Sequence, residues 1–295
     1  MSGMSNEAEE HAERPDEQAR RAYWRAQMEE AFAFMDGVKD VPYEDCGESL
    51  VSLRDAARDA GVEVAFSDTL LGNNRKRLFY MREGLIEKFA AVAREMNERE
   101  WVLKVEDGFR TIAMQTELGM QESVFPTIVR KIIWEEGGKI PSLDKIFRRL
   151  SVLVATSPRV GTHMSGSAMD ISVLRRDDGA EVDRGGPYLE LSELTPMASP
   201  FVSAEARQNR QEITAVMKRH GFVAYPWEFW HYSQGDTYDK YLTGSKQTAR
   251  YGAVDFDPET GRTTPMANPE RSLHSHDALA AAIEKALATI RKERG

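Results

Sequence analysis

The sequence has little cysteine and no long apolar run, and both absences narrow the class of protein. Its 295 residues include one cysteine, Cys46, which excludes an internal disulfide and fits a reducing compartment. No stretch approaches the roughly 20 apolar residues that span a bilayer. Residues 1–21 lack the apolar core of a secretion signal. We therefore expect a soluble, non-exported chain in the cytoplasm, with no membrane insertion.

Basic residues are also in deficit, with 39 Lys and Arg against 48 Asp and Glu and a formal net charge of −9. Proteins that follow a phosphate backbone need concentrated lysine and arginine, so nucleic acid is not expected as a partner. A repeat of fixed period is absent as well. The hydrophobic content of 41% is ordinary for a globular chain that forms one large domain or two small ones.

Hydrophobic periodicity predicts short strands and helices in an irregular order. Alternating or β-branched segments predict strands, and apolar residues three or four apart predict helices. Strands are expected within 62–66, 101–107, 167–176 and 222–233, and helices within 47–61, 82–100, 121–138, 142–150, 203–220 and 276–295. Because the two types do not alternate regularly, we expect an α+β fold and not a doubly wound sheet.

Two segments combine histidine with a carboxylate. GTHMSGSAMDIS, at 161–172, places His163 among small residues and seven positions before Asp170. WEFWH, at 227–231, places Glu228 three positions before His231. Two imidazoles, one carboxylate ligand and a second carboxylate as base are what a catalytic zinc site needs. Each segment alone also fits a simpler interpretation, a hydrogen-bonded turn in the first case and an aromatic core strand in the second.

Taken together, the two segments resemble the D-alanyl-D-alanine dipeptidase family of zinc peptidases. This family is grouped with D-Ala-D-Ala carboxypeptidases, peptidoglycan endopeptidases and the hedgehog signalling domain. Its pattern S-x-H-x-x-G-x-A-x-D is matched at 161–170 except for the first serine, and its E-W-W-H resembles residues 228–231. Its D-A-Y-R resembles residues 107–110, and the helix before its second motif resembles residues 209–222. The resemblance covers residues 60–255.

The resemblance implies a role for each matched residue. His163, Asp170 and His231 would bind one Zn²⁺ per chain. Glu228 would act as the general base that activates the attacking water and then protonates the leaving amine. Arg110 would stabilise the developing oxyanion.

The resemblance also implies an organisation for the chain. The expected fold is α+β, with a small central, mostly antiparallel sheet flanked by helices and the zinc site on the sheet. Independently of the resemblance, the composition of residues 1–40, dense in Glu, Arg and Ala, predicts a charged, mobile N-terminal leader followed by a helix. Residues 41–265 would form the catalytic domain, and residues 266–295 a C-terminal helix.

Departures from the family pattern bear on the substrate. Gly161 replaces a serine whose hydroxyl is expected to hold the substrate carboxylate, and the adjacent Thr162 is the candidate to replace it. We therefore treat Gly161 and Thr162 as candidate substrate-binding residues. Phe109 and Thr111 replace the tyrosine and the proline of the family's D-A-Y-R-P.

A further departure lies in GGPYLELSE, at 185–193, which resembles the family's G-T-P-F-D-E-F-S-E. Leu189 replaces the aspartate that would meet the free ammonium of a dipeptide. Losing a charge-assisted contact of about 1.5 to 3 kcal/mol lowers the preference for dipeptides tenfold or more. Glu190 is adjacent, but on a regular strand its side chain would point elsewhere.

These features predict zinc-dependent hydrolysis of a peptide bond in small D-alanine-containing peptides. The overall resemblance favours a D-Ala-D-Ala dipeptidase, whereas Leu189 favours a D-Ala-D-Ala carboxypeptidase or a related peptidoglycan peptidase. A non-catalytic, zinc-containing binding module is a second alternative. The presence of Glu228 and Arg110 argues against it, because a pure binding site needs neither a base nor an oxyanion donor.

Other motifs give weaker alternatives. Ser142 and Lys145 match the S-x-x-K of penicillin-recognising serine enzymes, but the accompanying S-D-N and K-T-G elements are missing. Cys46 has no neighbouring base that would make it a nucleophile. His274 and His276 precede the C-terminal helix beside Ser275, where capping and exposure explain them better than metal binding.

Overall fold

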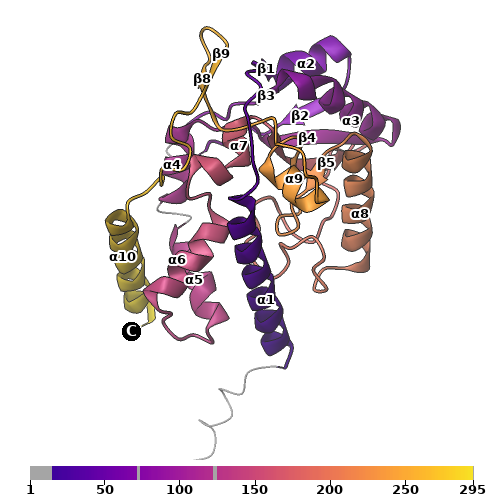
Figure 1. Cartoon of the computed structure of the whole chain (residues 1–295). Coiled ribbons are helices and arrows are strands. Elements are labelled where there is room, and N and C mark those ends of the chain that lie inside the picture. The colour runs from indigo at the N-terminus through magenta and orange to yellow at the C-terminus, as the bar shows by residue number, and fades with distance from the viewer. Residues whose placement is uncertain (1–14, 72–73, 122–124, 295) are drawn as a thin grey trace, which may run out of the picture.

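A five-stranded sheet lies at the centre of the structure, a computed structural model that describes residues 15–71, 74–121 and 125–294 (Figure 1). Strand β2 runs parallel to β4, and the other neighbouring pairs of this sheet are antiparallel. The prediction of an α+β fold with a mostly antiparallel sheet is confirmed. In spatial order the strands are β2 (Val64–Phe66), β4 (Trp101–Asp107), β5 (Ala168–Arg175), β7 (His231–Ser233) and β6 (Val223–Ala224).

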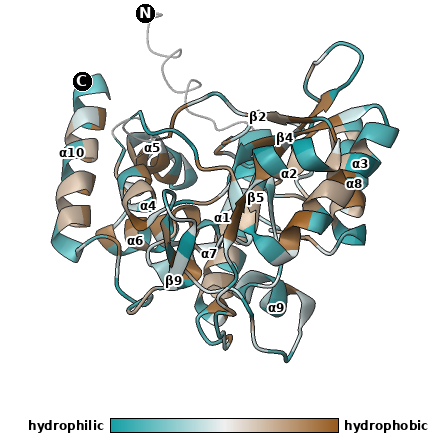
Figure 2. Ribbon diagram, turned by 90° about the horizontal axis from the view of Figure 1, so that it is seen from above, coloured by the Kyte–Doolittle hydropathy of each residue, from teal (hydrophilic) through white to brown (hydrophobic). Residues whose placement is uncertain are grey.

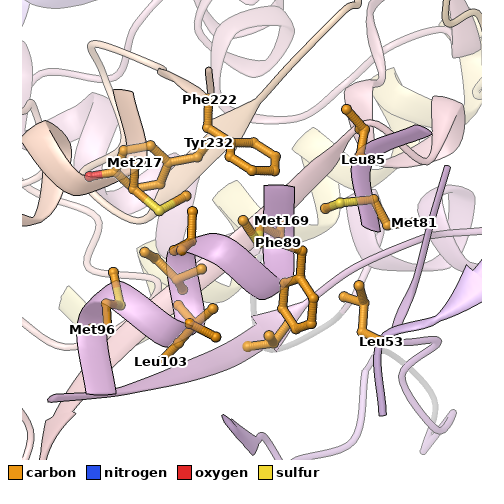
Figure 3. Packing of buried hydrophobic residues seen from close by; sticks show 14 of the residues in the cluster. Leu53, Met81, Leu85, Phe89, Met96, Leu103, Met169, Met217, Phe222 and Tyr232 are labelled. Carbon is orange, nitrogen blue, oxygen red and sulfur yellow. The ribbon is translucent and has the colours of Figure 1, made fainter. Parts of the chain in front are cut away.

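One face of this sheet carries the main hydrophobic core. Met169, Ile171 and Val173 alternate along β5 with polar residues that point to the opposite face, because successive side chains of a strand alternate. Helices α3 (Ile86–Glu98) and α8 (Ala204–Arg219) cover the apolar face. Figure 3 shows their side chains interlocking with those of the strands. The opposite face of β5 is therefore left for polar chemistry.

A second group of helices lies on the other side of the molecule. In Figures 1 and 2, α5, α6 and α10 stand apart from α3 and α8, with the sheet strands between the two groups. Helices α5 (Phe125–Glu135), α6 (Leu143–Leu153) and α10 (His276–Arg294) share a separate apolar cluster. Helix α1 (Pro15–Val38) packs against α5, α6 and the short α9 (Thr237–Thr243).

Local capping explains several helix boundaries that the sequence predicted. Helix α2 (Leu53–Ala60) ends at Gly61, whose φ of 63° is the left-handed conformation that glycine adopts without a steric penalty. Helix α8 begins after Ser203, whose hydroxyl accepts from Ala206 N at 2.9 Å. The hydroxyl of Ser142 likewise accepts from Lys145 N at 3.3 Å. The S-x-x-K match is thus the N-terminal cap of α6.

The remaining elements are short. Strands β1 (Leu50–Ser52) and β3 (Tyr80–Arg82) pair with each other. A hairpin of β8 (Val254–Asp257) and β9 (Arg262–Pro265) adds a pair of strands that the hydrophobic pattern did not predict. Helix α4 (Ile112–Gly119) follows β4, and the single-turn α7 (Thr162–Ser165) precedes β5.

Each terminal region contains a helix, as the sequence predicted. The helix predicted in the N-terminal region is α1, and the mobile leader expected before it falls in residues 1–14, outside the described residues. The predicted C-terminal helix is α10. Within the described ranges, no helix combines the length and apolar character needed to cross a bilayer.

Candidate active site

Three neighbouring strands place carboxylates and an imidazole in one row. Asp170 on β5 lies opposite His231 on β7 and opposite Asp107 on β4. The register between β4 and β5 shifts between Val105 and Asp107, which is a β-bulge. A bulge changes the direction of the following side chain, and here it brings Asp107 next to Asp170.

His163 joins this row from α7, the single helical turn before β5. The turn ends at Gly166, whose φ of 71° reverses the chain into the strand. A side chain at Gly166 would also meet Leu50. His163 Nε2 then lies 3.2 Å from Asp170 Oδ1. The small residues that surround the histidine in the sequence therefore serve to fold it back onto the sheet.

His163, Asp170 and His231 form a compact set of possible metal ligands. One ligand atom from each lies within 4.8 Å of the other two. His231 Nδ1 is 2.9 Å from Asp170 Oδ1, and all three residues are buried. Burial raises the pKa of Asp170, but the two imidazoles outweigh it and hold this pKa well below its ordinary value. Two nitrogens and one carboxylate oxygen fit the donor set of a catalytic zinc site.

Hydrogen bonds on the far side of each imidazole fix its orientation. His163 Nδ1 lies 2.7 Å from the carbonyl oxygen of Gly108. A carbonyl only accepts, so Nδ1 carries the hydrogen and Nε2 presents a lone pair to the ligand set. His231 Nε2 lies 3.0 Å from Thr162 Oγ1. This contact leaves His231 Nδ1 facing Asp170.

Glu228 reaches the same place from a turn between β6 and β7. On a regular strand, residues three apart point to opposite faces, but residues 225–231 form a turn in which His231 N donates to Glu228 O. Burial and the negative charge of Asp170 raise the pKa of Glu228 to about 7, against the opposing effects of His231 and Arg110. A carboxyl group with this pKa can both accept and release a proton near neutral pH.

Arg110 is buried beside the ligand set and held by three hydrogen bonds. Its Nε donates to Asp107 at 2.8 Å, Nη1 donates to Gln115 at 3.2 Å, and Nη2 donates to Asp170 at 3.3 Å. Burial lowers the pKa of Arg110, but Asp107 and Asp170 raise it above its ordinary value. An arginine has five N–H groups, so these three bonds within the described part of the chain leave two for a ligand. Arg110 is therefore part of the buried site and not a surface residue of the turn.

Three residues at the site were missed in the sequence. Asp107 and Gln115 hold Arg110, and the hydroxyl of Tyr188 donates to Asp170 Oδ2 at 2.9 Å. Burial and the charge of Asp170 raise the pKa of Tyr188, which keeps its hydroxyl protonated as a donor. The sequence could have indicated Tyr188, because this residue occupies the position of the phenylalanine in the family's G-T-P-F-D-E motif.

The departures from the family pattern have structural counterparts. The end of the Met164 side chain occupies the space next to Gly161 where the serine side chain would lie. Thr111, in place of the proline, caps α4 by accepting from Met114 N at 3.2 Å. Thr162 is engaged with His231 and also lines the cavity described below, as Gly161 does.

The expectation that Glu190 points away on a regular strand is wrong. Residues 187–190 form a turn in which Glu190 N donates to Pro187 O at 3.1 Å. Leu189 has a φ of 66°, a left-handed conformation that costs a leucine roughly 1 to 2 kcal/mol. Because of this turn, Leu189 and Glu190 both line the cavity beside the ligand set.

A cavity of about 290 Å³ connects these groups. The three candidate ligands, Glu228, Arg110, Thr162 and Gly161 all contribute to its lining. His163, Asp170 and His231 are the only group of three potential metal ligands within the described ranges. His276 and Cys46 are exposed, and neither they nor His274 line this cavity.

Comparisons with known proteins agree with this geometry. A sequence model of the family described as D-Ala-D-Ala dipeptidase matches residues 64–248. A D-alanyl-D-alanine dipeptidase of Synechocystis sp. is 25% identical over 244 residues, which cover 73% of this chain and 95% of that protein. A D-alanyl-D-alanine dipeptidase of Enterococcus faecium is 35% identical over 71 residues, 24% of this chain and 35% of that protein.

Among solved structures, the LdcB LD-carboxypeptidase is similar over 70% of this chain and 77% of its own, with 17% identity and a TM-score of 0.35. That structure is described as revealing the molecular basis of peptidoglycan recognition. The segment matched by the family, 64–248, contains the three candidate ligands, Glu228 and Arg110, whereas α1 lies outside it.

Proposed function

Because this chain belongs to the D-Ala-D-Ala dipeptidase family of peptidases, we propose that it is a zinc peptidase that cleaves small D-alanine-containing peptides. The observation that carries the proposal is the convergence of three candidate ligands, a carboxylate and an arginine on one cavity. A D-Ala-D-Ala dipeptidase is the first candidate activity. The relatives from Synechocystis sp. and Enterococcus faecium support it through their names.

We assign His163 Nε2, Asp170 and His231 Nδ1 as the ligands of one zinc ion. Their donor atoms and burial fit zinc, and three protein ligands leave a further position open, as catalytic sites do. Bound zinc would lower the pKa of a water molecule to about 7 and polarise the scissile carbonyl. Gly108 and Thr162 keep the two imidazoles in the orientation that this binding needs.

Glu228 carries the proton in the proposed reaction. Its carboxylate accepts a proton from the attacking water while the water oxygen bonds to the carbonyl carbon. The carbon–nitrogen bond then breaks, and Glu228 returns the proton to the leaving amine nitrogen. A pKa of about 7 suits both steps, because the carboxylate must be basic enough to accept the proton and acidic enough to release it.

Arg110 stabilises the negative charge that develops on the carbonyl oxygen. Its guanidinium keeps two free N–H groups, and Asp107 and Gln115 hold it in place before substrate arrives. A donor that is already fixed needs no reorganisation during the reaction. When His231 Nε2 donates to Thr162 Oγ1, the hydroxyl hydrogen of Thr162 is left to donate to a substrate carboxylate beside Gly161.

A carboxypeptidase that acts on the end of a longer peptide is the second candidate activity. Leu189 favours it, because leucine cannot pair with the ammonium of a dipeptide. The turn at 187–190 favours the dipeptidase, since it brings Glu190, an acidic residue next to Leu189, into the cavity lining. We assign Glu190 as the partner of the substrate ammonium if dipeptides are cleaved.

The test measures release of D-alanine by zinc-loaded protein from D-Ala-D-Ala and from a pentapeptide that ends in D-Ala-D-Ala. Cleavage of the dipeptide is expected, and Glu228→Gln should remove it. Cleavage of the pentapeptide alone would identify a carboxypeptidase. Zinc bound stoichiometrically without release from either peptide would contradict the proposal and favour a binding module.

The cytoplasmic location and the division at residues 40 and 265 stay predictions.

A further inference from the structure

The cavity at the candidate active site has two chemically different walls. The sheet side presents the candidate ligands, Glu228 and Arg110. The opposite side is apolar. Among the lining residues on that side, Glu190 is the one charged residue. The apolar side chains come from α1, α5, the end of α6, the segment between α6 and α7, and the loops that follow β5 and β6. They include Trp24, Met28, Met35, Ile128, Leu153 and Trp227.

The size of the cavity exceeds what a methyl side chain fills. Its volume of about 290 Å³ includes the space beside the candidate ligands and exceeds the 150 Å³ of an apolar cavity that binds benzene. Alanine side chains on both sides of a scissile bond would leave much of the apolar wall without contact. Unfilled space of this kind forfeits dispersion and hydrophobic free energy.

Part of the apolar wall comes from outside the segment that the family shares. Trp24, Met28 and Met35 belong to α1, whereas the family match begins at residue 64. The other apolar side chains of this wall lie within the matched segment, so the wall has two origins in the sequence. The matched segment supplies the candidate chemistry, and α1 adds apolar surface that this chain places against it.

Helix α1 is fixed firmly enough to act as a permanent wall. Phe34 packs against Tyr225, Trp227 and Tyr238, with ring centroids 5.0 to 5.5 Å apart. At the other end of the helix, Arg20 pairs with Glu193 at 2.7 Å. Trp24, Met28 and Met35 are each at least 95% buried. A pocket that is already formed needs little ordering when a ligand binds.

We propose that this apolar wall is a specificity pocket for a large hydrophobic side chain, aromatic or branched aliphatic, on a substrate residue next to the scissile bond. The proposal rests on the proposed peptidase function and refines its substrate class. The preferred substrate is then a peptide in which D-alanine lies on one side of the scissile bond and a bulky apolar residue on the other. D-Ala-D-Ala is a poor substrate by comparison.

The first test compares kcat/KM of zinc-loaded protein for D-Ala-D-Ala, D-Ala-D-Phe, D-Ala-D-Leu, D-Phe-D-Ala and D-Leu-D-Ala. The kcat/KM of at least one bulky peptide should exceed that of D-Ala-D-Ala by about tenfold or more, since a well-filled apolar pocket discriminates between substrates by this factor. The position of the bulky residue in the better substrates identifies the side of the scissile bond that the pocket serves. Equal or higher kcat/KM for D-Ala-D-Ala would overturn the proposal.

The second test fills the pocket. Met28→Trp should lower the ratio of kcat/KM for the best bulky peptide over D-Ala-D-Ala by about tenfold. Ala26→Trp introduces the same side chain on the exposed side of α1 and should leave this ratio unchanged. Met28→Phe repeats the test with a smaller side chain if the first variant does not fold. An unchanged ratio in a folded Met28 variant would contradict the assignment.

A third measurement separates this proposal from the proposed function. Glu228→Gln protein is titrated with D-Ala-D-Ala and with the bulky peptides by isothermal titration calorimetry. Binding at least about tenfold tighter to a bulky peptide supports the pocket even if no peptide is hydrolysed. Equal affinities overturn the pocket even if D-Ala-D-Ala is hydrolysed well.

Discussion

The sheet wall and the apolar wall of the cavity differ in how their residues are tied to function. On the sheet wall, each candidate group has a specific partner: Gly108 orients His163, Thr162 orients His231, and Asp107 holds Arg110. On the apolar wall, Trp24 and Met28 contribute surface and volume. A small change on the first wall should therefore remove one chemical step, whereas a change on the second should alter stability and substrate size.

The largest effect is expected for His163→Ala. Removing one of three ligands should reduce the zinc content from about one per chain to near zero, and activity should be lost with it. Zinc content can be measured by atomic absorption after dialysis. His220→Ala is the control, because His220 pairs with Glu95 on the surface, away from the cavity. A His163→Ala protein that keeps stoichiometric zinc would contradict the ligand assignment.

Glu228→Gln should retain zinc and lose turnover. The amide keeps the size of the carboxyl group but cannot accept the proton of the attacking water, so kcat should fall by about 10²- to 10⁴-fold. Initial rates and zinc content are measured on the same preparation. Near-normal kcat in this variant would exclude Glu228 as the base and move the search to another group in the cavity.

Met28→Ala should affect the apolar wall without affecting the metal. The free energy of unfolding, measured by urea denaturation of metal-free protein, should fall by about 2 kcal/mol, at the low end for a buried methionine because Met28 already borders a cavity. Met217→Ala, in the main core, should lower the free energy of unfolding by more, about 4 kcal/mol. The zinc content should stay at about one ion per chain in both variants. A larger loss for Met28 than for Met217 would show that the wall is ordinary core.

The smallest effect is expected for Tyr188→Phe. This change removes the hydroxyl that donates to Asp170 Oδ2 but keeps the ring. Hydrogen bonds to metal ligands typically affect affinity by about 10- to 100-fold, and the lower value is expected because Arg110 also donates to the same oxygen. Competition with a chelator measures the zinc affinity. An unchanged affinity would mean that Arg110 alone positions this carboxylate.

The sequence was most informative where local chemistry determines structure. Gly61 and Ser203 predicted helix ends, and the β-favouring residues of 167–176 predicted the strand that carries Asp170. The family motifs predicted His163 and His231 as partners, and the structure brings them together with Asp170. These features depend on neighbours in sequence or on a pattern with few alternatives.

The remaining features depend on contacts between distant segments. Trp24 and Met28 have the spacing of any buried helix face, so nothing in α1 alone indicates that it borders a cavity. The prediction that the side chain of Glu190 points away was wrong. The left-handed conformation of Leu189 is unusual for leucine and has no local sequence signal. Asp107 and Gln115 form their hydrogen bonds to Arg110 only after the bulge and α4 have formed.

The packing of α1 also affects the order in which the protein folds. Met35 accepts a hydrogen bond from Tyr238, 203 positions later in the chain. Synthesis proceeds from the N-terminus, so α1 leaves the ribosome long before the segment that covers Phe34 and Met35 exists. During that interval its apolar face lacks the partners that bury it in the folded protein. The cavity of the candidate active site can form only when most of the chain has been made.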